Sequence, residues 1–257
     1  MPGTYRIGLS VVAVLIWALI TVWGIWTPHD PAPLTQGLGG RLAWPIIGAG
    51  LFMLVVAMVM GWRDIGLVAP RPWTSLRLLL LPGLYLLLFL GLALAIGLPP
   101  PVTILFLLAN TLAVGFSEEI AFRGVLFHAL RTRLSLWPAI WLTSVAFGAV
   151  HVINGFTTGD FLEAAIQAVT AFMSGVFFMA VMLRTRSIIP AMLFHAFWDF
   201  LLTLIAAGVV STPVKGSVHW WTLVVPILFI LPNFLYGLWL LRKLDARETG
   251  LAPLPAS

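Results

Sequence analysis

Residues 102–127 read VTILFLLANTLAVGFSEEIAFRGVLF, an apolar run long enough to cross a bilayer. Within it, Glu118, Glu119 and Arg123 are flanked on both sides by Leu, Val, Ala, Ile and Phe. An ionisable side chain at the centre of a membrane-spanning helix costs roughly 2.5–3.5 kcal/mol on insertion scales, so such residues are rare and mark functional sites. This segment therefore predicts a membrane-spanning helix that carries part of a buried reaction site.

The composition of the whole chain agrees with this segment. Hydrophobic residues make up 61% of the 257 positions and charged residues only 9%, far from the usage of a soluble domain. Cysteine is absent, which excludes disulfides, zinc–thiolate sites and thiol nucleophiles. The net charge of +5 is spread between the apolar runs, as in loops at an anionic membrane face. We expect the lipid bilayer as a partner and no nucleic acid.

Apolar stretches of about 20 residues, the length that crosses a bilayer, recur along the chain. Eight are predicted to span the membrane: 8–27, 44–62, 76–98, 102–127, 136–153, 161–183, 187–209 and 219–241. The pattern predicts an all-α, polytopic membrane protein of about eight transmembrane helices, with the site between helices of the second half. We expect a single integral membrane domain over residues 1–257, with a motif-bearing core at about 102–209 and a short cytoplasmic tail at about 242–257.

Lysine and arginine are distributed asymmetrically around these spans. With the N-terminus inside, all 14 basic residues except Arg41, Lys215 and the intramembrane Arg123 fall on the inner side. This is the bias of the positive-inside rule. We therefore expect a protein of the prokaryotic inner membrane with both termini on the cytoplasmic side.

Two acidic residues of the opening segment are placed to face different partners. Glu119 and Arg123 are four residues apart, so on a helix they share a face and can form an ion pair that offsets the desolvation of the arginine. Glu118 lies about 100° further round the helix. It is therefore free to face a group on another helix.

Two histidines lie in later apolar runs. The sequence FGAVH at 147–151 brings His151 to the end of the fifth span, and HAFWD at 195–199 places Asp199 one helical turn after His195. Each polar group alone can be structural, as a buried ion pair or a hydrogen-bonded histidine that fixes helix packing. Their occurrence together on three helices of so apolar a chain favours a reaction site.

These residues resemble, in order and in type, the three motifs of the CPBP intramembrane proteases, also called the Abi family. The motifs in this sequence are Glu118-Glu119-x-x-x-Arg123, Phe147-x-x-x-His151 and His195-x-x-x-Asp199. That family includes the CAAX prenyl endopeptidases and bacterial bacteriocin-processing or self-immunity proteins. Its third motif usually ends in asparagine, whereas position 199 is aspartate, which when ionised accepts hydrogen bonds but does not donate them.

The resemblance implies an intramembrane endopeptidase that hydrolyses a peptide bond in a membrane-associated protein or peptide. Under this hypothesis Glu118 and His151 activate a water molecule. His195, with Asp199, holds or polarises the developing oxyanion.

Three further residues are implied to support the site, and the need for a metal stays open. Glu119, Arg123 and Phe147 would orient the site or grip the substrate. In the competing hypothesis a zinc ion is bound by Glu118, His151 and His195. Because the HExxH motif is absent, we favour glutamate catalysis without a cofactor, with zinc as the alternative.

Other function classes remain alternatives at this point. A proton-coupled transporter also buries Glu and His along a pathway, but it normally shows related halves, and the first three spans hold almost no buried charge. A non-catalytic scaffold or bacteriocin-immunity protein would carry the same motifs, and only an activity assay separates it from an enzyme. The substrate class is also open between a prenylated CAAX peptide, a leader peptide and a membrane-embedded protein.

Straight helices create one geometric conflict. At 1.5 Å per residue, Glu118 lies about 24 Å from the outer end of the fourth span, and His151 lies about 22 Å from the inner end of the fifth. These groups would sit at opposite depths. We therefore expect a helix that is broken, tilted or begins deeper than these bounds. The favoured places are a break after Gly115, with Ser117 capping a new helix, and the start of the fifth span.

Overall fold

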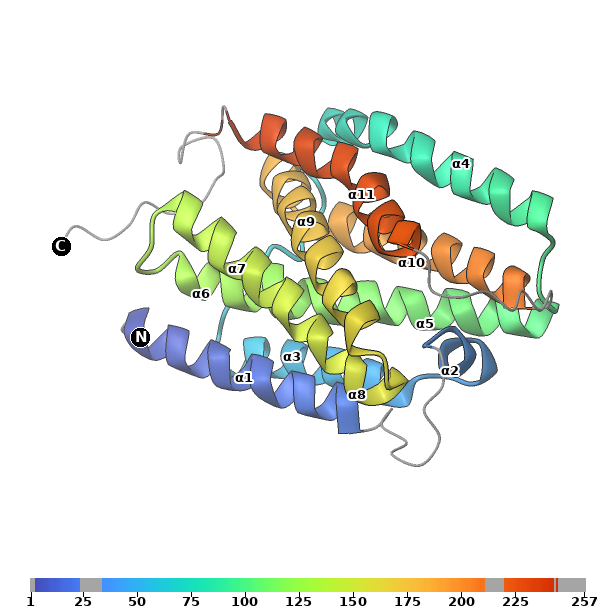
Figure 1. Cartoon of the computed structure of the whole chain (residues 1–257). Coiled ribbons are helices and arrows are strands. Elements are labelled where there is room, and N and C mark those ends of the chain that lie inside the picture. The colour runs from blue at the N-terminus through green and yellow to red at the C-terminus, as the bar shows by residue number, and fades with distance from the viewer. Residues whose placement is uncertain (1–2, 24–33, 211–219, 243, 245–257) are drawn as a thin grey trace.

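The computed structural model describes residues 3–23, 34–210, 220–242 and 244, which form an all-helical bundle (Figure 1). Within these residues, seven helical segments are long and apolar enough to cross a membrane. The helices are α1 (Gly3–Trp23), α2 (Leu34–Gly40), α3 (Trp44–Val59), η1 (Trp73–Leu79), α4 (Leu80–Ile96), α5 (Pro101–Glu119), η2 (Ile120–Leu126), α6 (Phe127–Leu130), α7 (Leu136–Val150), η3 (His151–Ile153), α8 (Asn154–Thr158), α9 (Phe161–Thr185), α10 (Ile189–Val210) and α11 (Trp220–Leu241). The chain is an integral membrane protein of the polytopic, all-α class that its sequence predicts.

Within the described residues the predicted spans coincide with helical segments, and one of them is short. Residues 24–27 of the first predicted span, residue 219 of the last and most of the predicted tail at 242–257 lie outside the described residues. The span predicted at 44–62 is α3, which has 16 residues, fewer than the roughly 20 that cross a bilayer. The brief helix α2 before it was not predicted. It is anchored by Asn110 of α5, a fully buried side chain that donates to the carbonyls of Leu38 and Arg41, both at 2.7 Å, and accepts from the Ala43 amide at 2.8 Å.

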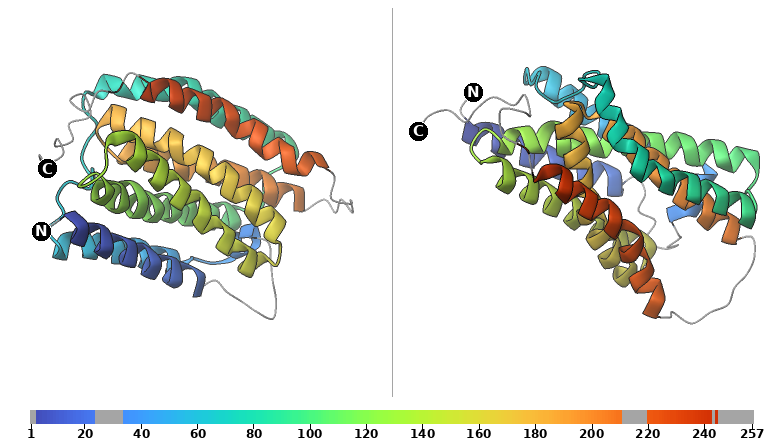
Figure 2. Two further views of the ribbon diagram at one scale, coloured as in Figure 1. Left: turned by 60° about the vertical axis from the view of Figure 1, so that its left-hand side comes forward. Right: turned by 90° about the horizontal axis from the view of Figure 1, so that it is seen from above.

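The helix α9 lies at the centre of the bundle. It packs against α7 on one side and α11 on the other, while α10 packs against α5 and α4. The helices α1 and α3 pair on the opposite side of the molecule from α4 and α11 (Figures 1 and 2). The share of buried residues is highest in α9, 61% against 17% to 44% in the other candidate spans. Because α9 is enclosed by other helices, polar groups that neighbouring helices turn toward it are shielded from lipid.

The fourth span does not break at Gly115, so that prediction was wrong. α5, η2 and α6 form one continuous segment of 30 residues, Pro101–Leu130. A Cβ at Gly115 would lie 2.6 Å from the Met192 carbonyl oxygen, so glycine is needed here for close contact with α10 and not for a break. Ser117 caps no helix, because it lies inside α5 and its hydroxyl accepts a hydrogen bond of 2.7 Å from the Trp17 indole.

The length of this segment removes the conflict in depth. The turn between α6 and α7 joins the adjacent ends of the two segments that carry Glu118 and His151. From Leu130 back to Glu118 is about 18 Å, and from Leu136 forward to His151 is about 22 Å, at 1.5 Å per residue. The two groups therefore reach a similar depth because the fourth helix continues three residues past its predicted end, and no break is required.

Candidate active site

The two glutamates stand where the fourth membrane segment changes its winding. Glu118 and Glu119 end α5, and the next residues, Ile120–Leu126, form a π-helical turn. Single π turns within α-helices are rare and occur often at functional sites. All seven residues of this turn are buried, so the widened turn lies in the protein interior and not against lipid.

Glu119 joins two positively charged or polar partners through a single oxygen. Its Oε1 lies 3.0 Å from Nη1 of Arg123 and 3.1 Å from Nδ1 of His195. The side chains of Glu119 and Arg123 are both fully buried, and that of His195 is 6% exposed. The ion pair predicted from their spacing is present, and it also positions the histidine of α10.

The other nitrogen of His195 faces two further carboxylates. Its Nε2 lies 3.4 Å from Oδ2 of Asp199 and 3.7 Å from Oε2 of Glu118. The imidazole stacks on Phe178 of α9 with ring centroids 4.7 Å apart and an interplanar angle of 24°. Contacts on both nitrogens and on one ring face therefore fix the orientation of His195.

His151 presents one nitrogen to the same glutamate. Its Nδ1 donates to the Phe147 carbonyl oxygen at 2.7 Å, so in the neutral ring Nε2 carries the lone pair. That Nε2 lies 3.9 Å from Oε2 of Glu118. This glutamate oxygen is buried and makes no hydrogen bond with any described residue. Separations of this size between polar atoms are those that a bridging water spans.

The Arg123 guanidinium is sealed from the surroundings by aromatic rings. Its Cζ lies 4.1 Å from the ring centroid of Phe147 and 5.3 Å from that of Phe178. Gly175 of α9 leaves room for it, because a Cβ there would lie 3.3 Å from Nη2 of Arg123. A fully buried arginine under two rings is placed to support the site through Glu119, and a direct contact with substrate stays a prediction.

Comparison with known proteins identifies the part of the chain that holds these residues. Residues 100–201 match the family model of the type II CAAX prenyl endopeptidases, described as Rce1-like. This part of the chain is a domain of the Rce1-like CAAX prenyl endopeptidase family. The family resemblance seen in the sequence is thereby confirmed. No curated protein and no solved structure matched the chain.

A cavity of about 440 Å³ opens beside the carboxylates and histidines of the Rce1-like domain. His151, His195 and Asp199 line it, as does Phe147. The helix α9 adds three polar side chains that the sequence analysis did not single out, Gln167, Thr170 and Ser174. They recur at intervals of three and four residues, which places them on one helix face, and this spacing was the available signal.

One of these polar residues is held by a partner close to His151. Asn154, three residues after His151, donates through Nδ2 to Oε1 of Gln167 at 2.8 Å. Because the oxygen of the Gln167 amide is engaged, its NH₂ group remains as a donor. The cavity lining thus combines one carboxylate, Asp199, and the two histidines with neutral polar groups of α9.

The zinc ligand set proposed for the Rce1-like domain was Glu118, His151 and His195. Zinc sites bring their ligand atoms to about 2.0–2.2 Å from one ion in a tetrahedral arrangement. Among the described residues, no group of three or more His, Asp or Glu side chains has the arrangement that could hold a metal ion. His195 has a carboxylate beside each ring nitrogen: Glu119 beside Nδ1 and Asp199 beside Nε2. Each nitrogen therefore already faces a hydrogen-bond acceptor and is not left to bind a metal ion. The residues do not fit the metal, and no chemical step is derived through it.

Proposed function

We propose that the protein is an intramembrane endopeptidase in which Glu118 is the general base. The observation that carries this proposal is the buried Oε2 of Glu118, which lacks a hydrogen-bond partner among the described residues. It lies 3.9 Å from Nε2 of His151 and 3.7 Å from Nε2 of His195. A buried acceptor left without a donor is costly, and a water molecule placed between these atoms would satisfy it.

The two acceptors orient that water for attack. An ionised Glu118 and the lone pair of His151 Nε2 both accept, so the water donates one hydrogen to each. Its oxygen lone pairs then point away from both groups and toward a peptide carbonyl in the cavity. Glu118 removes a proton as the water oxygen bonds to the carbonyl carbon, and it returns that proton to the amine nitrogen as the oxyanion collapses and the C–N bond breaks, which is general acid–base catalysis.

His195 is placed to hold the oxyanion that this attack produces. Glu119 faces its Nδ1 and Asp199 faces its Nε2. Both carboxylates accept hydrogen bonds, so a doubly protonated imidazolium satisfies both at once. Its single Nε2–H is then shared between Asp199 and the oxyanion, which is electrostatic stabilisation of the transition state. In this arrangement Asp199 does not have to donate a hydrogen bond to the oxyanion, as an asparagine could. Its carboxylate instead keeps Nε2 of His195 protonated, and that N–H is the donor.

The remaining motif residues support this arrangement without touching the substrate. Glu119 links Arg123 to His195, and Phe147 covers the guanidinium while its carbonyl sets the tautomer of His151. The Rce1-like family match supports a protein or peptide substrate. We propose that this substrate is prenylated or embedded in the membrane, and that hydrolysis needs no cofactor.

The membrane placement is part of the same proposal. We propose one integral domain in the prokaryotic inner membrane, and the distribution of basic residues supports an orientation with both termini cytoplasmic. Under that topology the candidate site lies inside the bilayer, between helices of the second half of the chain. The substrate's scissile bond would then reach the site from the membrane.

The deciding experiment measures peptide cleavage by the purified protein in liposomes. The probe is an internally quenched peptide with a prenylated CAAX C-terminus, compared with the same peptide without the prenyl group. Glu118→Gln keeps the size of the side chain but removes the basic oxygen, so kcat should fall by roughly 10²–10⁴, the contribution typical of a general base. Glu163→Gln is the matched control, since Glu163 lies exposed in the first turn of α9 and should cleave as the parent does.

Near-normal cleavage by a folded Glu118→Gln variant would rule out the general-base assignment. A parent protein that cleaves neither peptide, nor any candidate membrane protein, would favour the non-catalytic scaffold. Loss of parent activity with a zinc chelator, restored by added zinc, would favour the metal-assisted alternative. Retained activity with the chelator supports glutamate catalysis.

A further inference from the structure

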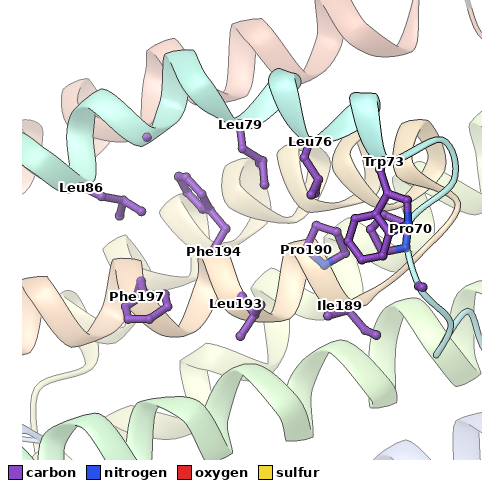
Figure 3. A pocket seen from close by; sticks show the side chains of 12 residues that line it. Pro70, Trp73, Leu76, Leu79, Leu86, Ile189, Pro190, Leu193, Phe194 and Phe197 are labelled. Atoms are coloured by element: carbon purple, nitrogen blue, oxygen red, sulfur yellow. The ribbon is translucent and has the colours of Figure 1, made fainter.

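A second cavity, of about 520 Å³, lies on the other side of α10 from the candidate active site. It runs between η1 and α4 on one side and the first half of α10 on the other (Figure 3). Its walls are apolar throughout: Trp73, Leu76 and Leu79 face it from η1, and Leu193 and Phe197 face it from α10. We call this cavity the α4–α10 groove.

The winding of η1 explains how the upper wall of the groove forms. η1 is a 3₁₀-helix of seven residues, in which side chains three residues apart are eclipsed. Trp73, Leu76 and Leu79 therefore stand in one row above α10. The row is followed by Gly83 in α4, where an added Cβ would meet no atom within 4 Å. The missing side chain at Gly83 leaves the groove open in its middle.

The α4–α10 groove is separate from the site that holds the catalytic groups. α10 turns Leu193 and Phe197 toward the groove, whereas it turns His195 and Asp199 toward the other cavity. Trp198 and Phe89 of α4, whose rings lie 5.0 Å apart, line the active-site cavity and not the groove. What fills the groove is therefore a question independent of the reaction.

The depth of the groove matches one leaflet of a bilayer. Its α10 wall runs from Ile189 to Phe197, which is about 12 Å at 1.5 Å per residue. Half of the hydrocarbon core of a bilayer is about 15 Å. Both walls belong to candidate membrane-spanning segments, Trp73–Ile96 and Ile189–Val209, so the groove lies at the depth of lipid acyl chains.

The groove is too narrow for a helix of another protein. A volume of about 520 Å³ spread over about 12 Å gives a mean cross-section of about 40 Å². A helix with its side chains is about 10–12 Å across, which needs about twice that section or more. A single hydrocarbon chain is the class of ligand that the cross-section admits.

Two exposed arginines occur in the sequence around one end of the groove. Pro70 and Trp73 close that end; Arg71 stands between them in the sequence, and Arg77 follows Leu76 of the groove wall. The opposite end, at Leu86 and Phe197, is apolar. Basic side chains at the membrane surface attract anionic lipid headgroups, and the predicted topology places these two at the inner leaflet, where anionic lipids are enriched.

We propose that the α4–α10 groove binds one acyl chain of an anionic phospholipid from the surrounding bilayer, with the headgroup phosphate against Arg71 and Arg77. The lipid completes the packing between η1, α4 and α10, which is otherwise open at Gly83. The site neither assumes nor affects the assignment of the reaction.

The test is photo-crosslinking in vesicles of phosphatidylcholine that contain a trace of phosphatidylglycerol with a diazirine at the end of one acyl chain. Mass spectrometry of the parent protein should place adducts on the peptides of Trp73–Ile96 and Ile189–Phe197. Gly83→Phe should fill the groove and lower these adducts at least fivefold. Gly91→Phe is the matched control, because it is the same change on the same helix, also open around its Cβ, but outside the groove. It should label as the parent does.

A second arm tests the headgroup. Labelling by the phosphatidylglycerol probe should exceed labelling by the matching phosphatidylcholine probe, and Arg71→Gln with Arg77→Gln should remove that preference. Melting curves establish that Gly83→Phe and Gly91→Phe are both folded. If the two variants then lose adducts equally, or retain them equally, the groove is not the lipid site. Equal labelling by the two probes in the parent would overturn the anionic headgroup. Crosslinks between two copies of the chain at this groove, lost in Gly83→Phe, would also overturn the proposal in favour of a dimer contact.

Discussion

Two arginine–carboxylate pairs occupy very different surroundings in this protein. Near the start of α1, Arg6 donates two hydrogen bonds, of 2.9 and 2.6 Å, to the two oxygens of Asp64, whose side chain is 52% exposed. Inside the bundle, Arg123 makes one contact of 3.0 Å to Glu119, and both side chains are fully buried. The pair at the surface is therefore the better hydrogen-bonded of the two.

This contrast indicates what the buried pair is for. Burying two charges costs several kcal/mol per ion, which is recovered only with very good geometry and further hydrogen bonds. Nε and both Nη atoms of Arg123 make no hydrogen bond of good geometry with the described residues, and neither does Oε2 of Glu119. The stability of the fold does not account for such a pair. Its contact with His195 does, because the shared Glu119 oxygen positions that ring.

The largest effect is expected when the buried pair is broken. Arg123→Ala removes the guanidinium from the buried carboxylate of Glu119 and leaves it only the contact with His195, so the free energy of unfolding should fall by about 3–5 kcal/mol. Thermal unfolding in detergent measures this loss, and peptide cleavage should fall with it. A melting temperature equal to that of the parent would show that the pair contributes nothing to the folded state.

Replacing both partners at once separates stability from function. Arg123→Met combined with Glu119→Leu removes both charges and keeps apolar volume, so stability should return to the parent level or exceed it by about 1–4 kcal/mol. Cleavage should remain lost, because Nδ1 of His195 has no acceptor. A double variant that is stable and also fully active would mean that the pair does not position His195.

Asp199 offers an intermediate case, since it belongs to the same network but is 34% exposed. Asp199→Ala should lower kcat by roughly 10–100-fold, the range seen when the carboxylate behind a functional histidine is removed. Asp199→Asn should be much milder, because the amide oxygen can still accept from His195. Unfolding should change little in either variant. If the alanine variant cleaves as fast as the parent, His195 acts without this residue.

The smallest effect is expected at the surface pair. Arg6→Ala should cost about 1 kcal/mol or less, the usual range for exposed ion pairs. Burial raises the pKa of the Asp64 carboxyl, but the hydrogen bond and charge of Arg6 and the charge of His128 outweigh it and hold the pKa below its ordinary value of 3.8.

This lowered pKa sets the pH dependence of the surface pair. A carboxyl whose pKa falls on folding stabilises the folded protein at pH values above the pKa that the carboxyl has in the unfolded chain. This stabilisation is lost as the pH falls through the pKa of the carboxyl in the folded protein. The difference in unfolding free energy between the parent and Arg6→Ala should therefore be fully present at neutral pH, begin to shrink as the pH approaches 3.8, and vanish only below the folded pKa, which lies lower. Melting curves of the parent and the variant at neutral pH and at acidic pH, each repeated in 1 M salt as a control, measure this difference in stability. A difference that grows on acidification would contradict this account.

The helices and the motif residues could be predicted because both depend on local properties of the chain. A span needs about 20 apolar residues in succession, and each of the eight predicted runs became a helical segment. The Glu119–Arg123 pair follows from a spacing of four residues on one helix. The ionisable residues were conspicuous because charges in such runs are costly.

Features that depend on contacts between distant segments could not be predicted in this way. Gly115 and Ser117 suggested a helix break, but the break is absent because Gly115 admits α10 and Ser117 accepts from Trp17, one hundred residues away in the sequence. The π turn after Glu119 has no sequence signature of its own. The role of Asn110, which ties α2 to α5, also appears only once the two helices are packed together.

By itself, the sequence determined that the chain is an all-helical membrane protein with ionisable residues on three of its helices, since hydrophobicity and helical spacing act within one segment. The tertiary structure decided which of those residues meet. It brought Glu119 and His195, 76 positions apart, to 3.1 Å, and left the Glu118 oxygen between two imidazoles. It also opened the α4–α10 groove at Gly83. Distances of this kind depend on how helices pack side by side, and that packing is fixed by the shapes of all their side chains together.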